Sequence, residues 1–524
     1  MNNSFFTIIC LLIFSNTSNC QTLNVAWQKC IGGSGKEEKP VGLTRSDLSY
    51  TVGFSTISTN GDISGNKGDV DWFFSKYDKD QALVFGKIAG GSKTENFSSI
   101  HENSDKTYVA IGTTNSAAPG TTDGNVTNNH GGNDAWVTKL TANGSIQWRK
   151  CIGGIGEDQG NFTLETADNN YLLLGTTASA DGDFTSNAGS NDIFLIKCDI
   201  NGIFLFTKTF GGIGNDKAVG VTKLADGYMI LAESASSTFP GATNSNKGKN
   251  DFLLIKTDLN GTVSWSKFFG GPDEDNPTHI MTLSDGNVLV TGTTSSTSGD
   301  ITGAKGATDI WVAKISASGS LVWARNFGGT GNDLGKMAVE YASPNKYFII
   351  GTTSSNNGNV SGNKGGSDIW IAQLTSSGTF ESGKTFGGSQ DDFAGSITTT
   401  TDKAILITGE TLSNDGNVSG NHGGKDIWVA KLTQPTATFD LVNSFEMKLY
   451  PNPANSFVTV KWASNIKVET ITITNIFGQN INEIKLDSES DFFNLNTSFL
   501  QSGNYIISLK AKEGITRSML EVVK

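Results

Sequence analysis

An acidic residue recurs at one position of an internal repeat, four residues after the second Gly of a Gly-Gly doublet. In a closed ring of repeats, these carboxylates would form one circle at a mouth of the ring and attract cations or basic ligands. Alternatively, each carboxylate accepts backbone N–H bonds in the Gly-rich turn, as turn acids commonly do. Sevenfold repetition favours the structural interpretation, because a functional site usually uses the repeats unequally. The seven acids are Glu37, Glu95, Asp158, Asp216, Asp275, Asp333 and Asp392.

A second set of oxygen-bearing side chains lies in a Gly-rich loop of the same repeat. Its examples are Asp62, Asn66 and Asp71; Asp183, Asn187 and Asp192; and Asn417, Asn421 and Asp426. Oxygen ligands alternating with Gly suit Ca²⁺, but the terminal bidentate Glu of an EF-hand loop is missing. Ala242 and Ala304 also replace two of the expected ligands. Asx turns explain most of the pattern, so we predict no metal ligands and keep Ca²⁺ as the one candidate cofactor.

Patterns for catalysis are absent from the sequence. It contains no Gly-x-Ser-x-Gly, His-Glu-x-x-His, phosphate-loop or Ser-x-Asp-x-Gly-x-x-Trp motif. Adjacent acids such as Asp391 and Asp392 mean little without geometry. Recurring tryptophans such as Trp148 and Trp311 lie inside apolar strands, where they favour packing between repeats over a sugar-binding platform. We therefore predict no catalytic residue.

The elements that position these residues follow from the repeat itself. Gly-Gly doublets begin at Gly32, Gly90, Gly153, Gly211, Gly270, Gly328 and Gly387, and their spacing is 58 to 63 residues. A second mark, Asp before a four-residue apolar run, keeps the same period at Asp71, Asp134, Asp192, Asp251, Asp309, Asp368 and Asp426. The one long step reflects extra residues around Pro119 to Asn129.

Each repeat is expected to contain four short strands, as in the blade of a β-propeller. In the fourth repeat they cover 218–224, 228–232, 251–256 and 262–269. The third strand is apolar on both faces, which is typical of a sheet covered on both sides. The last repeat lacks a fourth strand, and residues 24–31 match the missing pattern. We predict an all-β fold, a seven-bladed propeller over 21–434 that its N-terminal strand closes.

The N-terminus and the composition indicate export. The apolar run from Phe5 to Phe14 is too short to span a bilayer and predicts a signal peptide over 1–20, with Gln21 as the first mature residue. The net charge of −12 argues against a nucleic-acid or anionic-membrane partner. Cys30, Cys151 and Cys198 remain after cleavage, and this odd number indicates buried free thiols. No later segment is long and apolar enough to cross a membrane.

The tail changes in composition after a linker at 435–445. Alternating strands at 457–462, 470–475 and 504–509 predict a small immunoglobulin-like β-sandwich over 446–524. The segment resembles the type A C-terminal sorting domain of the type IX secretion system of Bacteroidetes, and the repeats are similar to bacterial β-propeller repeats found in front of such domains. The residues that carry the resemblance are Tyr450, Pro451, Asn452, Pro453, Gly478, Gly503, Tyr505, Arg517 and Lys524.

This resemblance implies a protein secreted or attached to the outer surface of the outer membrane, with the secretion machinery as partner of the tail. For the propeller we expect a monomeric module that binds a protein or a glycan. The alternative is an extracellular polysaccharide hydrolase or lyase, which would use the irregular loops at 119–129 and 239–246.

Overall fold

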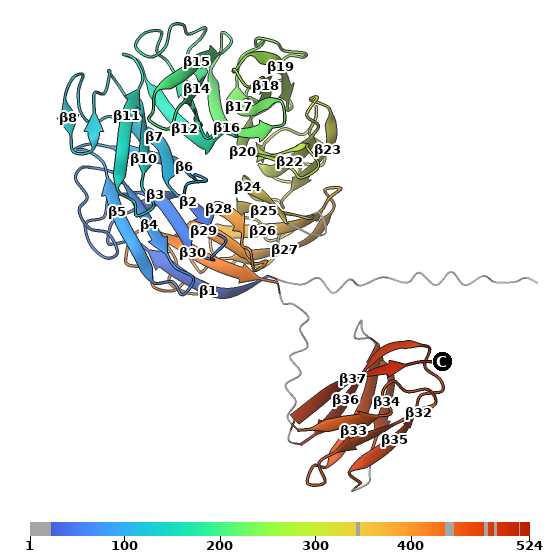
Figure 1. Cartoon of the computed structure of the whole chain (residues 1–524). Helices are drawn as coiled ribbons and strands as arrows, with labels where there is room; N and C mark the ends of the chain where they lie inside the picture. The colour runs from blue at the N-terminus through green and yellow to red at the C-terminus, as the bar shows by residue number, and fades with distance from the viewer. Residues whose placement is uncertain (1–22, 342–345, 435–444, 476–479, 487–489, 513) are drawn as a thin grey trace, which may run out of the picture. The chain divides into compact units, whose positions relative to one another are not determined.

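The structure is a computed structural model that describes residues 23–341, 346–434, 445–475, 480–486, 490–512 and 514–524. Every regular element of these residues is a β-strand, and the chain divides into two compact units, 1–435 and 436–524. The N-terminal unit is a ring of seven four-stranded antiparallel sheets, the blades of a propeller (Figure 1). The predicted fold class is therefore confirmed.

Blades 1 to 4 follow one another along the chain. Blade 1 contains β2 (Glu37–Thr44), β3 (Tyr50–Thr56), β4 (Asp71–Tyr77) and β5 (Leu83–Ala89). Blade 2 contains β6 (Glu95–Glu102), β7 (Tyr108–Thr114), β10 (Asp134–Leu140) and β11 (Ile146–Ile152). Blade 3 contains β12 (Asp158–Glu165), β13 (Tyr171–Thr177), β14 (Asp192–Cys198) and β15 (Phe204–Phe210). Blade 4 contains β16 (Asp216–Leu224), β17 (Gly227–Ser234), β18 (Asp251–Thr257) and β19 (Val263–Phe269).

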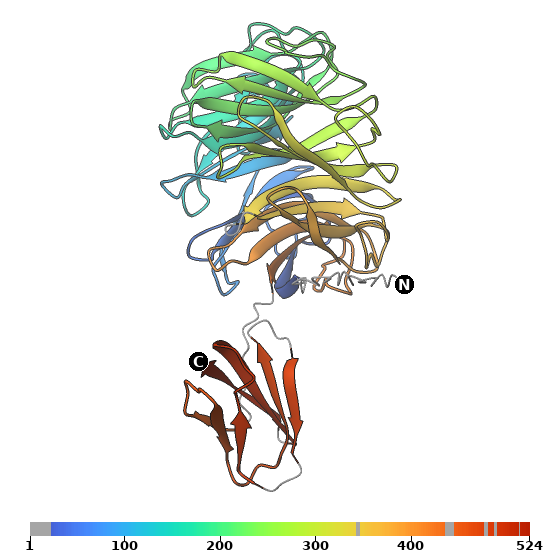
Figure 2. The ribbon, with the colours of Figure 1, turned by 90° about the vertical axis from the view of Figure 1, so that its right-hand side faces the viewer.

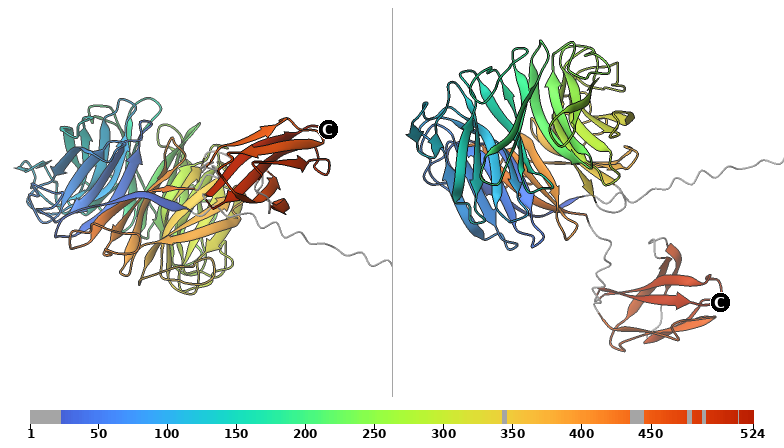
Figure 3. Two further views of the ribbon diagram at one scale, coloured as in Figure 1. Left: turned by 90° about the horizontal axis from the view of Figure 1, so that it is seen from below. Right: turned by 45° about the horizontal axis from the view of Figure 1, so that its top comes forward.

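Blades 5 to 7 complete the ring (Figure 2, Figure 3). Blade 5 contains β20 (Asp275–Thr282), β21 (Val288–Thr294), β22 (Asp309–Ile315) and β23 (Leu321–Phe327). Blade 6 contains β24 (Asp333–Tyr341), β25 (Lys346–Thr353), β26 (Asp368–Thr375) and β27 (Phe380–Phe386). Blade 7 contains β28 (Asp392–Thr399), β29 (Ile405–Thr411), β30 (Asp426–Thr433) and, from the other end of the unit, β1 (Asn24–Ile31).

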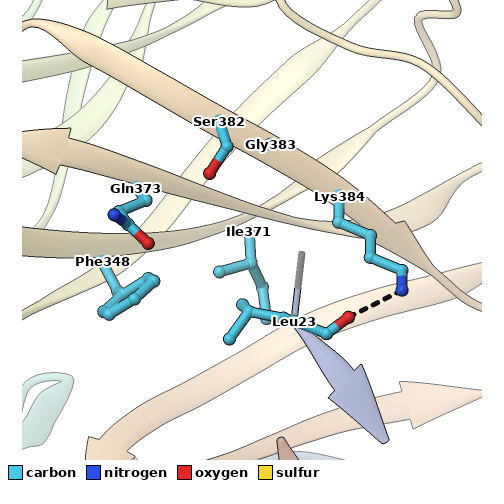
Figure 4. Close-up of a pocket in the computed structure, with 7 residues that line it drawn as sticks. All are labelled: Leu23, Phe348, Ile371, Gln373, Ser382, Gly383 and Lys384. Atoms are coloured by element: carbon cyan, nitrogen blue, oxygen red, sulfur yellow. Dashed lines mark hydrogen bonds between the residues drawn. The ribbon is translucent and has the colours of Figure 1, made fainter. Parts of the chain in front are cut away.

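Closure of the ring is the antiparallel pairing of β1 with β30, in which Cys30 lies opposite Trp428. Trp27 of β1 also stacks on Tyr50 of the next blade, with ring centroids 5.3 Å apart. Leu23, just before β1, is 6% exposed and packs into blade 6 beside Phe348 and Ile371 (Figure 4). The N-terminal strand therefore joins blade 7 and contacts the blades on both sides of it.

The blades pack face to face through their middle strands. The third strands β10, β14 and β22 are buried along their whole length, as their two-sided apolar pattern predicts. Trp72 of blade 1 and Trp136 of blade 2 lie 4.3 Å apart between ring centroids. A Cβ on Gly112 would come within 2.6 Å of the Trp72 ring, so this position of blade 2 admits only Gly. The recurring tryptophans thus fill the space between blades.

The first strands of successive blades contact one another in a closed circle, from β2 through β6, β12, β16, β20, β24 and β28 back to β2. They therefore surround the axis of the ring (Figure 1). Each of these seven strands also carries a β-bulge in its pairing with the second strand, for example between Gly335 and Met337. A bulge redirects side chains, so the residues at these positions depart from the regular alternation of the strand.

The C-terminal unit is a sandwich of a three-stranded and a four-stranded sheet. The first sheet contains β31 (Met447–Tyr450), β32 (Phe457–Trp462) and β35 (Phe492–Asn496). The second contains β34 (Asn480–Lys485), β33 (Val468–Asn475), β36 (Gly503–Ala511) and β37 (Gly514–Val522). Val460, Trp462, Ile471 and Leu509 belong to the core between the sheets. The predicted linker at 435–445 lies, except for Phe445, outside the described residues.

Candidate functional site

The seven repeat acids are fully buried, each with no exposed surface. Gly91 donates its backbone N–H to Glu95 Oε2 at 2.6 Å, and Thr114 Oγ1 donates to Glu95 Oε1 at 2.7 Å. The same bond from the second Gly of the doublet recurs in every blade at 2.6–3.2 Å. An exposed acidic ring at a mouth of the disc is therefore wrong for these residues. They are internal acceptors for a turn whose N–H groups have no strand partner.

The loop oxygens that resembled calcium ligands also face backbone N–H groups. Asp71 Oδ2 accepts from Lys67 N at 2.5 Å, Asn66 Oδ1 accepts from Gly68 N at 3.1 Å, and Asp62 Oδ2 accepts from Gly32 N at 3.2 Å. Among the described residues, no three His, Cys, Asp or Glu side chains gather closely enough to hold a metal ion. These contacts account for the repeated Asp and Asn as loop-closing acceptors.

The two repeat marks meet in space as pairs of carboxyl groups. A Cβ on Gly90 would lie 1.7 Å from Asp71 Oδ1 and 2.6 Å from Glu95 Oε2, so both carboxyls converge on this Gly. Asp71 belongs to blade 1 and Glu95 to blade 2. The same arrangement occurs for Asp134 with Asp158, Asp251 with Asp275, Asp309 with Asp333, Asp368 with Asp392 and Asp426 with Glu37. The sequence analysis identified both acids but did not predict that they lie close together. The first Gly of each doublet, on which both carboxyls converge, was the sequence feature that could have indicated it.

Burial and mutual repulsion shift the titration of these pairs. Burial raises the pKa of Asp71 to about 6, and the nearby Glu95 carboxylate acts in the same direction. Burial also raises the pKa of Asp134 and of Asp251 to about 6, with a smaller contribution from Asp158 and Asp275 respectively. Because the pairs have no exposed surface, they do not present two carboxylates to a substrate, as a glycosidase must.

The irregular loops expected for an enzyme have structural contacts of their own. The inserted segment forms a small hairpin, β8 (Thr122–Asp123) with β9 (Val126–Thr127). In the other loop, Phe239 is buried and Asn244 hydrogen-bonds in both directions with the backbone of Phe268 on β19. Neither loop brings together a set of acids or histidines among the described residues.

In the C-terminal unit, the Pro-Asn-Pro segment is bound to the last strand. Asn452 Nδ2 donates to Met519 O at 2.8 Å, and Glu521 N donates to Asn452 Oδ1 at 2.8 Å. Ala454 continues this pairing through bonds with Glu521 O and Val523 N. Pro451 and Pro453 are the neighbours of Asn452 in the sequence. The motif therefore joins the first and last segments of the sandwich.

Other motif residues serve the same junction. Lys524 Nζ donates to the carbonyls of Asn455 and Thr497 at 2.7 and 3.0 Å. Gly503 begins β36 opposite Val522, and Tyr505 Oη donates to Gln501 O at 3.0 Å. Gly478 lies outside the described residues.

Comparison with protein families assigns this unit. Residues 448–522 match the model described as the secretion system C-terminal sorting domain. The C-terminal unit is a type IX secretion sorting domain. It directs the protein to the outside of the cell, where the protein is secreted or attached to the outer surface. No helix among the described residues is both long and apolar enough to cross a membrane.

Comparison with solved structures finds distant similarities. The structure is similar to the plexin A4 full extracellular region, with a TM-score of 0.46 and 6% identity over 94% of this chain and 68% of that chain. It is also similar to the Pan2 WD40 domain of Neurospora crassa, with a TM-score of 0.41 and 9% identity over 80% of this chain and 97% of that chain. No curated protein matches the chain. The strand pairing described above establishes the propeller.

The sorting domain also exposes part of its motif. Arg517 lies opposite Ser508 on the four-stranded sheet and lines a shallow hollow of about 400 Å³ with Glu483 and Lys510. Tyr450, Phe457 and Phe492 are 49%, 54% and 48% exposed. The register of β31, β32 and β35 places these aromatic residues on the outer face of the smaller sheet. Apolar side chains of this size on one face are typical of a surface that meets another protein.

Proposed function

We propose that the exported propeller is a non-catalytic binding module that engages a protein or a glycan outside the cell. The observation that carries the proposal is the pairing of a sorting domain with a closed seven-bladed disc. Propellers commonly hold ligands at the mouths of the central ring, where loops and innermost strands from several blades meet. A polysaccharide hydrolase or lyase is the untested alternative, and no observation on the described residues favours it.

The repeated polar residues support this proposal because their own hydrogen bonds leave ligand recognition to other residues. The buried acids and the loop oxygens bind backbone N–H groups within the ring. Selective recognition must then come from residues that differ between blades. Such differences occur on the innermost strands, where the fourth residue of the strand varies from Pro40 to Lys336.

The mature chain from Gln21 to Lys524 provides the test. It is screened against arrays of glycans and of surface proteins, with and without Ca²⁺. The proposal expects a saturable interaction with a subset of ligands and no release of products from bound polysaccharides. Product release would support the enzymatic alternative, and the absence of any saturable ligand would contradict the proposal.

A further inference from the structure

One innermost strand carries a charged residue at a position where the other six are neutral. At the position three residues after the repeat acid, the seven blades carry Pro40, Ser98, Asn161, Val219, Thr278, Lys336 and Gly395. Lys336 is the one ionisable residue of this set. It is the bulge residue of β24, since the pairing of β24 with β25 shifts between Gly335 and Met337. It is also exposed to solvent, although the strand on which it lies borders the ring axis.

The electrostatic surroundings of Lys336 include charged groups of two other blades. Although solvent reaches the Lys336 side chain, the protein around it displaces much of the bulk water, and this lowers its pKa. Glu410 of blade 7 opposes the change, and Lys39 of blade 1 lowers the pKa further. Blades 6 and 1 are not neighbours, because blade 7 separates them in the ring. Both lysines lie at β-bulges of innermost strands that border the ring axis, Lys336 on β24 and Lys39 on β2.

The carboxylates near these lysines already have partners. Glu410 Oε1 accepts from the backbone N–H of Lys39 at 2.8 Å, and Glu410 Oε2 accepts from Lys425 Nζ at 2.8 Å. Glu38 Oε1 forms ion pairs with Lys36 at 2.6 Å and with Lys425 at 3.2 Å. The two glutamates thus pair with the ammonium groups of Lys36 and Lys425 and not with those of Lys336 and Lys39.

Among the described residues, the ammonium groups of Lys336 and Lys39 have no ion pair and no hydrogen bond. The chain carries a net charge of −12, so a local excess of positive charge at the ring axis is contrary to the rest of the molecule. A cluster of like charges raises the local concentration of counter-ions. Two unpaired ammonium groups on strands that border one axis supply a recognition element for an anionic group.

Neutral polar groups surround the same axis. Asn161 and Thr278 occupy the position of Lys336 in blades 3 and 5, and both are partly exposed. Asn161 Oδ1 accepts from Thr176 Oγ1 at 3.2 Å, which leaves its amide N–H groups as donors. Amide and hydroxyl groups of this kind complement the hydroxyl groups of a sugar, whereas the lysines complement a carboxylate.

We propose that the central ring, through Lys336 and Lys39, binds the carboxylate of an acidic saccharide, such as a polymer that contains uronic acid. This inference rests on the proposed binding function and names the chemical class of its ligand. The lysines hold the carboxylate, and the amides and hydroxyls of the other blades contact the sugar ring. An acidic polypeptide would satisfy the lysines alone, so it is the competing ligand class.

The test measures the affinity of the mature chain for oligogalacturonate by calorimetry, with methyl-esterified oligogalacturonate and poly-glutamate as comparison ligands. Wild-type protein should bind oligogalacturonate, lose at least about tenfold in affinity on methyl esterification and bind poly-glutamate more weakly. Lys336→Gln and Lys39→Gln should each raise the Kd about tenfold, and Lys336→Arg should keep the Kd within about threefold. Lys208→Gln, on the outer strand β15, is the control for the loss of one charge.

Thermal unfolding of each variant shows that it is folded, and Lys336→Arg keeps the test valid if the Gln variant is not. Equal affinity of wild type and Lys336→Gln for oligogalacturonate would overturn the inference. Tighter binding of poly-glutamate would overturn the saccharide class. If the arrays yield another ligand whose affinity is insensitive to Lys336, the binding function stands and this inference fails. If no ligand binds at all, both fail.

Discussion

Lys384 donates a hydrogen bond from its Nζ to the backbone carbonyl of Leu23 at 2.6 Å, so blade 6 holds the residue that precedes the N-terminal strand (Figure 4). Gln434, just after the last propeller strand, donates to Gln373 of the same blade at 2.6 Å. Both ends of the propeller are therefore bound to blade 6, in addition to their pairing in blade 7. A ring closed by two distant chain segments depends on such contacts, because no covalent bond joins the segments.

Leu23→Ala should destabilise the propeller. The side chain is 6% exposed and packs beside Phe348 and Ile371, so its truncation leaves a cavity at the seam. We expect a loss of about 2–3 kcal/mol in the free energy of unfolding, measured by urea denaturation. Leu205→Ala, at a side chain that is 54% exposed, is the matched control and should change the free energy by less than about 0.5 kcal/mol. Equal effects of the two variants would show that the seam does not hold the ring.

The carboxyl pairs between blades predict that the propeller becomes more stable as the pH falls from 8 to 5. The pKa of Asp71, Asp134 and Asp251 rises to about 6 in the folded state, from about 4 in an unfolded chain. A raised carboxyl pKa favours the protonated form, so this stability is complete below pH 4 and is lost as the pH rises through 6. Below pH 4, paired acids such as Asp168, whose pKa is lowered to about 2, begin to oppose the gain.

Asp71→Asn isolates one of these pairs. An Asn keeps an acceptor for Lys67 N and removes the repulsion from Glu95. In two other blades His130 and His422 lie beside the equivalent acids Asp134 and Asp426, so Asp71 gives the simpler test. We expect the variant to gain about 1–2 kcal/mol relative to wild type at pH 8 and little at pH 5, from urea denaturation at both values. A variant that is destabilised equally at both pH values would contradict shared protonation of this pair.

Asn452→Ala should loosen the junction between the first and last segments of the sorting domain. The change removes two hydrogen bonds of 2.8 Å, to Met519 O and from Glu521 N. Because Asn452 is exposed, we expect a loss of about 1 kcal/mol in the stability of this unit. Hydrogen exchange at the amide of Glu521 should become faster. Asn465→Ala, at an exposed Asn near Trp462, provides the control and should leave that amide unchanged.

Much of the fold could be predicted because the same strand and turn pattern recurs seven times in the sequence. The predicted fourth-repeat strands agree with β16 to β19 within two residues, and the closing strand 24–31 matches β1. The free, buried state of Cys30, Cys151 and Cys198 was also predicted correctly. The hairpin of β8 and β9 was missed, because two-residue strands in a Gly- and Asn-rich insert carry no hydrophobic pattern.

The candidate site was harder to predict, because spatial encounters between blades decide it. Asp71 and Glu95 are 24 positions apart and belong to different sheets, so neither strand pattern indicates that they meet at Gly90. The nearby Glu410 is bound to the backbone of Lys39 on β2 and to the side chain of Lys425 just before β30, and no pattern within β24 indicates these contacts. In the sorting domain the motif residues also meet across a long stretch of sequence, since Asn452 binds Met519 and Glu521, which are 67 and 69 positions away. There, sequence resemblance located the residues without any prediction of their contacts.

Export by the C-terminal domain is the central claim, and surface delivery of a truncated chain tests it most directly. The full chain and a chain that ends at Phe445 are expressed in a bacterium with a type IX secretion system, and intact cells are treated with an external protease. We predict that the propeller of the full chain is found outside the cell, either released or accessible to the protease, whereas the truncated chain remains protected in the periplasm. Normal appearance of the truncated propeller outside the cell would contradict the account.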